Sequence, residues 1–410
     1  MEARGHWRDS EENRFPVNFP FTPDQLPPGQ ARGMLETVDP GTHVELSVVR
    51  LALDATWSPG LTARVAVDAV DLHDRNPTST DDEVDVDELW LRFGREAPPA
   101  TAPERPGGWV KLGKFPKFER QDDRHLESYG LVSTAFNRFE DLGVEAGLDL
   151  GRHARLVASA TRGNPVFLRD PNALAGDNGT AERLTPPNPD PELGSGVPIL
   201  YDAEVEPEDG GDPELGGGLG LRWSDPQGNG VELLVFGYQR ELAERVEIEG
   251  SRYGGDLDLL RGPFNAFPFP LQGDDKREVG ASLWLYLGGV SLFGQFVDQD
   301  LAGLGRTGFE TELAWRIGLP SGLAVRGRPL FPAVAPAVRY SRLDPDFAAP
   351  AVTPSPSFAW EWEKVDVGVR LTLVEGVDLT VEYARNEFVR AVGPARNDEL
   401  LATARWKVGR

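Results

Sequence analysis

Apolar and polar residues alternate along most of this chain, in segments of about ten residues that turn or loop residues separate. Between Val49 and Trp57 the odd-numbered residues are apolar, and Arg50, Asp54 and Thr56 stand among the residues between them. Because successive side chains of a β-strand point to opposite faces, this period indicates strands with one apolar and one polar face. Helical periodicity is hard to find, and the chain lacks a run of about 18 apolar residues, the length of a transmembrane helix.

The segment 142–150 carries the same pattern with a sharper contrast between its faces. Leucine, valine and alanine occupy the even positions, whereas Gly143, Glu145, Gly147 and Asp149 occupy the odd ones. An apolar face backed by charges and glycines suits a wall with lipid outside and water inside. The mean hydropathy of −0.37 agrees with such a wall, since only every second residue would face lipid.

The connections between the segments alternate between short turns and longer loops. The short turns fall at 58–60, 151–153, 224–230, 288–289, 320–322 and 375–376. Two of the longer loops cover about 163–213 and 241–275. Outer-membrane barrels have this asymmetry, with short periplasmic turns and long extracellular loops.

Parity extends the count of roughly fifteen segments to about sixteen strands, because bacterial barrels have even numbers. The added ascending strand is expected near 31–44. We therefore predict one transmembrane antiparallel β-barrel over 41–410, preceded by an extended arm over 1–40 that can hold the first strand. A barrel of this size should enclose water. Aromatic residues near strand ends support lipid interfaces: Trp57, Phe93, Trp223, Trp315, Trp360, Trp362, Tyr383 and Trp406.

Composition narrows the function. The 66 acidic residues outnumber the 42 basic ones, for a formal charge of −24, which argues against a nucleic-acid partner. The absence of cysteine excludes a zinc–cysteine site, a thiol nucleophile and a disulfide scaffold. The N-terminus lacks an apolar signal region, so we expect that a signal peptide has already been removed from a protein of the bacterial outer membrane.

Catalytic and metal-binding patterns are weak. His125 near Asp122, Asp123 and Ser128 is the one combination that resembles a hydrolase set, and closeness within a loop is poor evidence for it. The acidic run 81–88 lacks the spacing and central glycine of an EF-hand, which favours a hydrated loop over a calcium site. We predict a protein that is not an enzyme, without a resident metal or cofactor.

The stretch 109–151 resembles the phosphate-selective porin O/P family and related Gram-negative porins. The likeness lies in a strand containing LGKF (112–115), a polar loop, an aromatic-Asn-Arg group at 136–138 and DLGV (141–144) opening the next strand. PAVRYSR (336–342) also looks like a late strand of such porins. The resemblance implies a sixteen-stranded outer-membrane barrel, often trimeric, in which residues about 116–136 fold inward as a constriction. Unlike members of that family, the chain ends without a terminal aromatic residue.

Phosphate-selecting members of that family line the lumen with arginines and lysines. The inward positions of this chain carry both basic and acidic residues, so we do not extend the family's anion selectivity to this chain. The expected lumen-facing residues are Arg64, Asp68, Arg92, Glu145, Asp149, Arg155, Arg222, Glu232, Glu310, Glu312, Arg316, Asp366, Arg370, Glu382 and Arg405. The expected constriction residues are Lys117, Arg120, Asp122, Asp123, Arg124, Glu127 and Arg138. Such residues can form an electrostatic filter, and a solvated loop of self-paired charges is the alternative.

The leading hypothesis is a porin that lets small polar or charged solutes or ions diffuse passively through a barrel in contact with outer-membrane lipids. A homotrimer is an assembly that the family resemblance allows. A second hypothesis is a sleeve or scaffold for a partner, such as a lumenal plug, a surface protein or an electron-transfer complex, which the long acidic loops favour. A barrel enzyme built on His125 is the third.

Overall fold

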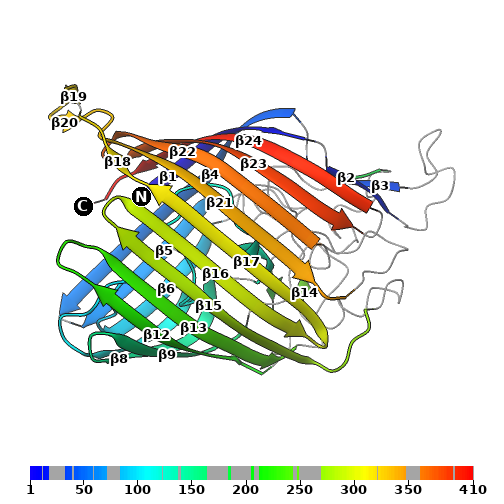
Figure 1. Cartoon of the computed structure of the whole chain (residues 1–410), viewed down its shortest axis with the longest axis horizontal. Helices are drawn as coiled ribbons and strands as arrows, with labels where there is room; N and C mark the ends of the chain where they lie inside the picture. Colours follow the sequence, from blue (N-terminus) through cyan, green and yellow to red (C-terminus); the bar gives the residue numbers. More distant parts are fainter. Residues whose placement is uncertain are drawn as a thin grey trace.

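The computed structural model describes residues 1–11, 13–17, 33–38, 41–58, 60–71, 84–121, 123–136, 140–163, 183–185, 205–206, 212–242, 247–248, 269–320, 322–347, 361–390 and 393–409. The chain forms a closed antiparallel β-barrel of sixteen strands, which confirms the predicted fold (Figure 1). None of the helices within these residues is long and apolar enough to cross a membrane.

The barrel strands follow one another around the wall in chain order. They are β1 (Glu2–Ser10), β4 (Gly41–Ser58), β5 (Leu61–Asp71), β6 (Asp85–Gly94), β7 (Gly108–Pro116), β8 (Glu140–Leu150), β9 (Ala154–Thr161), β12 (Glu214–Ser224), β13 (Gly230–Glu241), β15 (Asp275–Leu287), β16 (Val290–Leu301), β17 (Leu304–Trp315), β21 (Ala333–Pro345), β22 (Glu361–Val374), β23 (Val377–Arg390) and β24 (Gly393–Lys407).

Short elements complete the description. The strand β18 (Ile317–Gly318) continues β17 along β21. Three small sheets lie apart from the wall: β2 (Asn13–Val17) with β3 (Gly33–Val38) and β10 (Arg183–Thr185), β11 (Val205–Glu206) with β14 (Glu247–Ile248), and β19 (Ala324–Val325) with β20 (Arg328–Pro329). The helix α1 (Leu131–Ala135) lies in the connection between β7 and β8.

Strand β1 closes the barrel, because it pairs with β24 on one side and with β4 on the other. The N-terminal amine donates a hydrogen bond to the carbonyl of Val408 at 2.9 Å, and both chain ends lie at the same end of the barrel (Figure 1). This corrects the expected position of the first strand near 31–44. Residues Gly33–Val38 do form a strand, but it pairs with β2 and β10 instead of the wall. The N-terminal strand was missed because Arg4, His6 and Arg8 leave it little apolar character.

The wall exposes its apolar face and buries its charged one, the reverse of a soluble protein. On β4, Leu53 is 63% exposed, and on β8 Leu148 and Leu150 are likewise exposed. The neighbouring inward residues Asp68 and Glu145 are buried. The alternation read from the sequence therefore separates an apolar exterior from a charged interior, as expected for a barrel in lipid.

Aromatic residues collect on the exterior near the end with the short turns. Trp57, Phe93, Trp223, Trp315 and Trp406 are all largely exposed there. Trp362 departs from this prediction, since it is buried in an apolar cluster with Phe388 and lies on the inner face of β22. Trp360 lies outside the described residues.

The two ends of the barrel differ in their connections, though less strictly than the sequence predicted. At the short-turn end, Gly288 (φ +60) and Gly376 (φ +84) adopt left-handed conformations that favour glycine. The predicted turn at 320–322 instead belongs to a longer connection, 316–332, which contains β18, β19 and β20. At the opposite end, 302–303 makes a tight turn from β16 to β17, and β23 ends only two residues before β24 begins. Most of the predicted loops 163–213 and 241–275 lies outside the described residues.

Candidate pore constriction

Residues 117–121 and 123–136, in the connection between β7 and β8, enter the barrel and pack against the inner face of the wall across from these strands. The segment carries apolar side chains that a loop in water would not bury, and Leu126, Val132 and Phe136 are each buried. They contact inward apolar residues of the wall, and α1 packs on β16, β17 and β21. Phe118 stacks on Tyr238 with ring centroids 5.5 Å apart. We call residues 117–136 the inner segment.

Carboxylates of the wall accept hydrogen bonds from backbone N–H groups of the inner segment. Glu382 accepts from the amides of residues 127 and 128 at 2.7 and 2.8 Å. Glu312 accepts from the amide of His125 at 2.8 Å, and Glu310 accepts from that of Val132 at 3.2 Å. Because the inner segment has only one short helix among its described residues, most of its N–H groups have no helical carbonyl to bind. The buried carboxylates of the wall supply these hydrogen-bond acceptors instead.

Cations and amides of the wall donate to the carbonyl oxygens of the same segment. Arg339 donates to the carbonyl of Ser128 at 2.9 Å, and Lys364 donates to that of Tyr129 at 2.5 Å. Arg370, Gln295 and Arg306 donate to the carbonyls of Arg124, Glu119 and Ala135. The mixed charges of this wall therefore fix the path of the inner segment, which was not foreseen from the sequence.

Ion pairs hold the beginning of the inner segment. Lys117 pairs with Glu214 of β12, which also binds Lys276 of β15 at 2.6 Å. Arg120 pairs with Glu140 at the start of β8. Asp123 is exposed and accepts a hydrogen bond from the hydroxyl of Tyr286 at 2.8 Å.

Glu127 lies among three guanidinium groups from three different strands. Its carboxylate is 2.8 Å from Arg370, 3.6 Å from Arg4 and 3.7 Å from Arg405. Burial alone would raise the pKa of Glu127, but the three arginines, with Arg124, outweigh it and hold the pKa below its ordinary value. The carboxylate therefore stays ionised in neutral and mildly acidic solution.

The charge of Glu127 gives a pH prediction. The pKa of Glu127 is lower in the folded protein than in the unfolded chain, where it is near 4.5. The ionised carboxylate therefore stabilises the folded protein above pH 4.5, and this stabilisation is lost as pH falls through the folded pKa. We expect Glu127→Gln to raise the chloride-to-potassium permeability ratio at pH 7, and the difference from wild type to persist at pH 5. The two proteins should converge only below pH 4.5. Reversal potentials in a KCl gradient measure this, and convergence already between pH 7 and 5 would contradict it.

Some inward charges on β4 to β6, away from the strands that hold the inner segment, are more exposed than those beneath the segment. Arg339, beneath the inner segment, is 0% exposed, whereas the side chain of Asp54 on β4 is 56% exposed and faces the interior beside Arg64 at 3.2 Å. Arg50 and Arg92 on the same side are partly exposed. These four charged side chains are therefore open to water, although Asp68, Asp87 and Glu88 of the same strands are buried.

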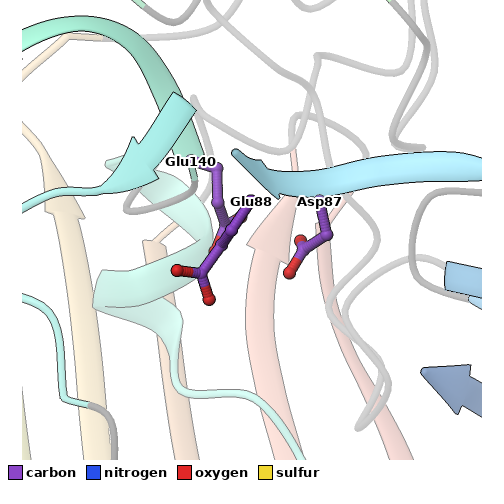
Figure 2. A group of neighbouring side chains, drawn as sticks. All are labelled: Asp87, Glu88 and Glu140. Atoms are coloured by element: carbon purple, nitrogen blue, oxygen red, sulfur yellow. The ribbon is translucent and has the colours of Figure 1, made fainter. Parts of the chain in front are cut away.

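Three carboxylates gather near the inner segment, on Asp87, Glu88 and Glu140 (Figure 2). A β-bulge between β5 and β6 turns both Asp87 and Glu88 inward, and one oxygen from each of the three lies within 4.8 Å of the others. Each carboxylate has an arginine partner. Asp87 pairs with Arg50 at 3.0 Å, Glu88 pairs with Arg64 at 3.0 Å, and Glu140 pairs with Arg120. The donor set is thus neutralised by guanidinium groups, and we assign it no cation.

The predicted constriction residues Lys117, Arg120, Asp123, Arg124 and Glu127 all lie on the inner segment, and Asp122 and Arg138 lie outside the described residues. Among the predicted lumen-facing residues, those contacting the inner segment directly are Glu310, Glu312, Arg370, Glu382 and Arg405. Others pair with charges of nearby strands. Glu145 with Lys111 and Asp68 with Arg50 join adjacent strands, whereas Arg155 with Glu232 and Arg222 with Asp149 each reach over one intervening strand.

Arg316 differs from the other predicted positions, because it is exposed just beyond the end of β17. Sequence reasoning missed Arg339 and Lys364, although both occupy inward alternate positions in strands and could have been found from that pattern. The proposed hydrolase set is not assembled. His125 contacts Glu312 at 3.2 Å, whereas the hydroxyl of Ser128 binds Arg339 at 2.5 Å.

The fold is that of outer-membrane channels. The outer membrane channel DcaP of Acinetobacter baumannii has a TM-score of 0.54 and 11% sequence identity, covering 99% of this chain and 95% of that one. OprB of Pseudomonas putida, in a high-pH structure, has a TM-score of 0.50 and 10% identity, covering 99% and 93%. No protein-family model matches the sequence, and no curated protein matches it significantly.

Proposed function

We propose that this protein is an outer-membrane porin through which small polar or charged solutes diffuse passively. The observation that carries the proposal is the inner segment, which narrows a barrel with an apolar exterior and a charged interior. A buried segment held on one wall, with exposed charges on the other, is the arrangement expected of a constricted aqueous path. The role is non-enzymatic.

Single-channel recording tests the proposal. Purified protein that shows heat-modifiable gel migration should give discrete conductance steps in a planar lipid bilayer. Folded protein without steps would contradict an open pore. Copurification of a stoichiometric partner together with silent bilayers would favour the sleeve hypothesis instead.

We place the solute path between the inner segment and the wall formed by β4 to β6. The exposure of Asp54, and of the nearby Arg64 and Arg50, supports this placement. Anions and cations would both meet charged groups there, so we propose weak charge selectivity and no preference for phosphate. The resemblance of 109–151 to the phosphate-selective porin family supports the inward fold of the segment.

Asp54→Asn tests the position of the path. Loss of this carboxylate leaves Arg64 less neutralised, so we expect the chloride-to-potassium permeability ratio to rise about twofold. Asp344→Asn is a matched control, because Asp344 forms a similar pair with Arg342 at 2.6 Å on the outward face of β21. The control should keep the wild-type ratio. Equal ratios for Asp54→Asn and wild type would move the path away from β4.

We also propose a homotrimer, which rests on the family resemblance of the sequence. Chemical cross-linking of detergent-solubilised protein should then give a three-chain species, and a purely monomeric pattern would contradict it.

A further inference from the structure

A second segment enters the barrel at the short-turn end. Residues 95–107 connect β6 to β7, although Gly94 already pairs with Trp109 and a tight turn would suffice to join these strands. Ala100 is 3% exposed and belongs to the same apolar cluster as Trp109. Connections at the short-turn end of such barrels are ordinarily brief, so this length needs an explanation.

The segment extends over part of the barrel mouth, from β7 to β12 and β13. The amide of Ala100 donates to Glu232 of β13 at 2.8 Å, and the amide of Ala102 donates to Ser224 of β12 at 2.8 Å. Strands β8 and β9 separate these partners from β7 in the wall, so the segment passes over the ends of two strands. Gly230 permits the close approach, because a Cβ there would lie 2.0 Å from the carbonyl oxygen of Ala100.

Inward charges anchor the beginning of the segment as well. Glu96 lies 2.9 Å from Arg92 and 3.5 Å from Lys111, both on the inner wall. Four prolines, at 98, 99, 103 and 106, restrict the backbone and reduce the number of conformations it can adopt. Thr101, Glu104 and Arg105 remain exposed at the mouth. The segment is therefore fixed at both sides and presents polar residues to water.

We propose that residues 95–107 form a second constriction at the short-turn mouth, so that a solute passes two narrow regions in series. This inference rests on the proposed porin function. Both segments contact β12, but at opposite ends of that strand: Lys117 pairs with Glu214 at its start, whereas Ala102 binds Ser224 at its end. The two segments therefore restrict the barrel at different levels along its axis. The exposed side chains at 101, 104 and 105 are the residues that contact solute there.

Shortening the segment tests the proposal. Replacement of residues 97–106 by Gly-Ser-Gly preserves β6 and β7 and should raise single-channel conductance in KCl by about 1.5- to 2-fold. Liposomes containing the variant should swell in neutral sugars too large for wild type. The matched control shortens residues 319–332, which also lie at the short-turn end. This connection carries the exposed hairpin β19–β20, and the residues on either side of it, Gly318 and Ala333, pair with each other. The control should keep wild-type conductance and sugar cut-off.

A thiol probe tests the same inference without shortening the chain. Because the protein has no cysteine, Thr101→Cys introduces a single reactive thiol. A bulky methanethiosulfonate reagent should then reduce the single-channel current by about half, whereas the same labelling of Leu323→Cys on the exposed hairpin should leave it unchanged. Complete labelling at 101 with unchanged current would overturn the second constriction, as would unchanged conductance of the folded shortened variant. Absence of steps from wild type would instead overturn the porin function itself.

Discussion

Replacing residues 118–136 by a short Gly-Ser linker is expected to raise single-channel conductance at least threefold, to about the level of an unconstricted barrel of this size. The wall should survive the change, because β7 and β8 pair with each other along their whole lengths without help from the inner segment. The wall carboxylates Glu310, Glu312 and Glu382 would lose their backbone partners and gain water. Conductance in KCl and the size of the largest permeating sugar measure the effect.

Two controls make this result specific to the inner segment. Heat-modifiable migration shows whether the barrel has closed, and the variant shortened at 319–332 shows whether any loop replacement alters conductance. An enlarged pore in both variants would point to general loosening of the barrel. Wild-type conductance in a closed barrel that lacks 118–136 would contradict a constriction at this place.

Arg339→Ala is expected to lower the free energy of unfolding by about 3–5 kcal/mol, as removal of one partner of a buried ion pair does. Arg339 is fully buried, donates to Asp366 at 2.8 Å and holds the carbonyl of Ser128. Its loss leaves Asp366 without its closest cation and frees the middle of the inner segment. Urea titration in detergent measures the stability, and open-channel current noise, which should increase, measures the mobility of the constriction.

Arg342→Ala is the matched control, three residues further along the same strand. Arg342 faces outward, is about half exposed and pairs with Asp344 at 2.6 Å. Exposed pairs contribute about 0–1 kcal/mol, so its loss should be nearly neutral and leave current noise unchanged. Similar destabilisation of the two variants would show that burial at position 339 has no special importance.

The barrel could be predicted from the sequence because its two faces differ so consistently. The segment 142–150 has its leucines exposed and Glu145 buried, as the alternation indicated. The strand at Glu2–Ser10 escaped detection, because its outward face alternates small residues with Trp7 and Asp9, which gives little contrast with the arginines and histidine inside. The tight turn at 302–303 was also missed, because the polar residues 298–300 read as a loop, whereas β16 runs through them.

The inward position of the inner segment was predictable but its set of contacts was not, and its role as a constriction stays a prediction. Its boundaries came from a family resemblance, and the described part of 117–136 lies inside the barrel. The partners could not be derived, since Glu382 and Arg339 are more than 200 residues from the backbone groups that they bind. Local patterns carry no information on which inward charge meets which carbonyl. The sequence thus predicted mixed lumenal charges, but not that many of them support the chain itself.

The position of β1 has a consequence for how the chain is assembled. Its partners on one side lie in β24, far away along the chain, as the bond between the amine of Met1 and the carbonyl of Val408, 407 positions apart, illustrates. Until β24 is available, β1 has one free edge and the growing sheet ends in another, and unpaired edges readily join other chains. Pairing over such a separation is also slow, because the intervening chain must first be ordered. The folding chain therefore depends on protection of two edges until the fifteen-residue strand β24 pairs with β1.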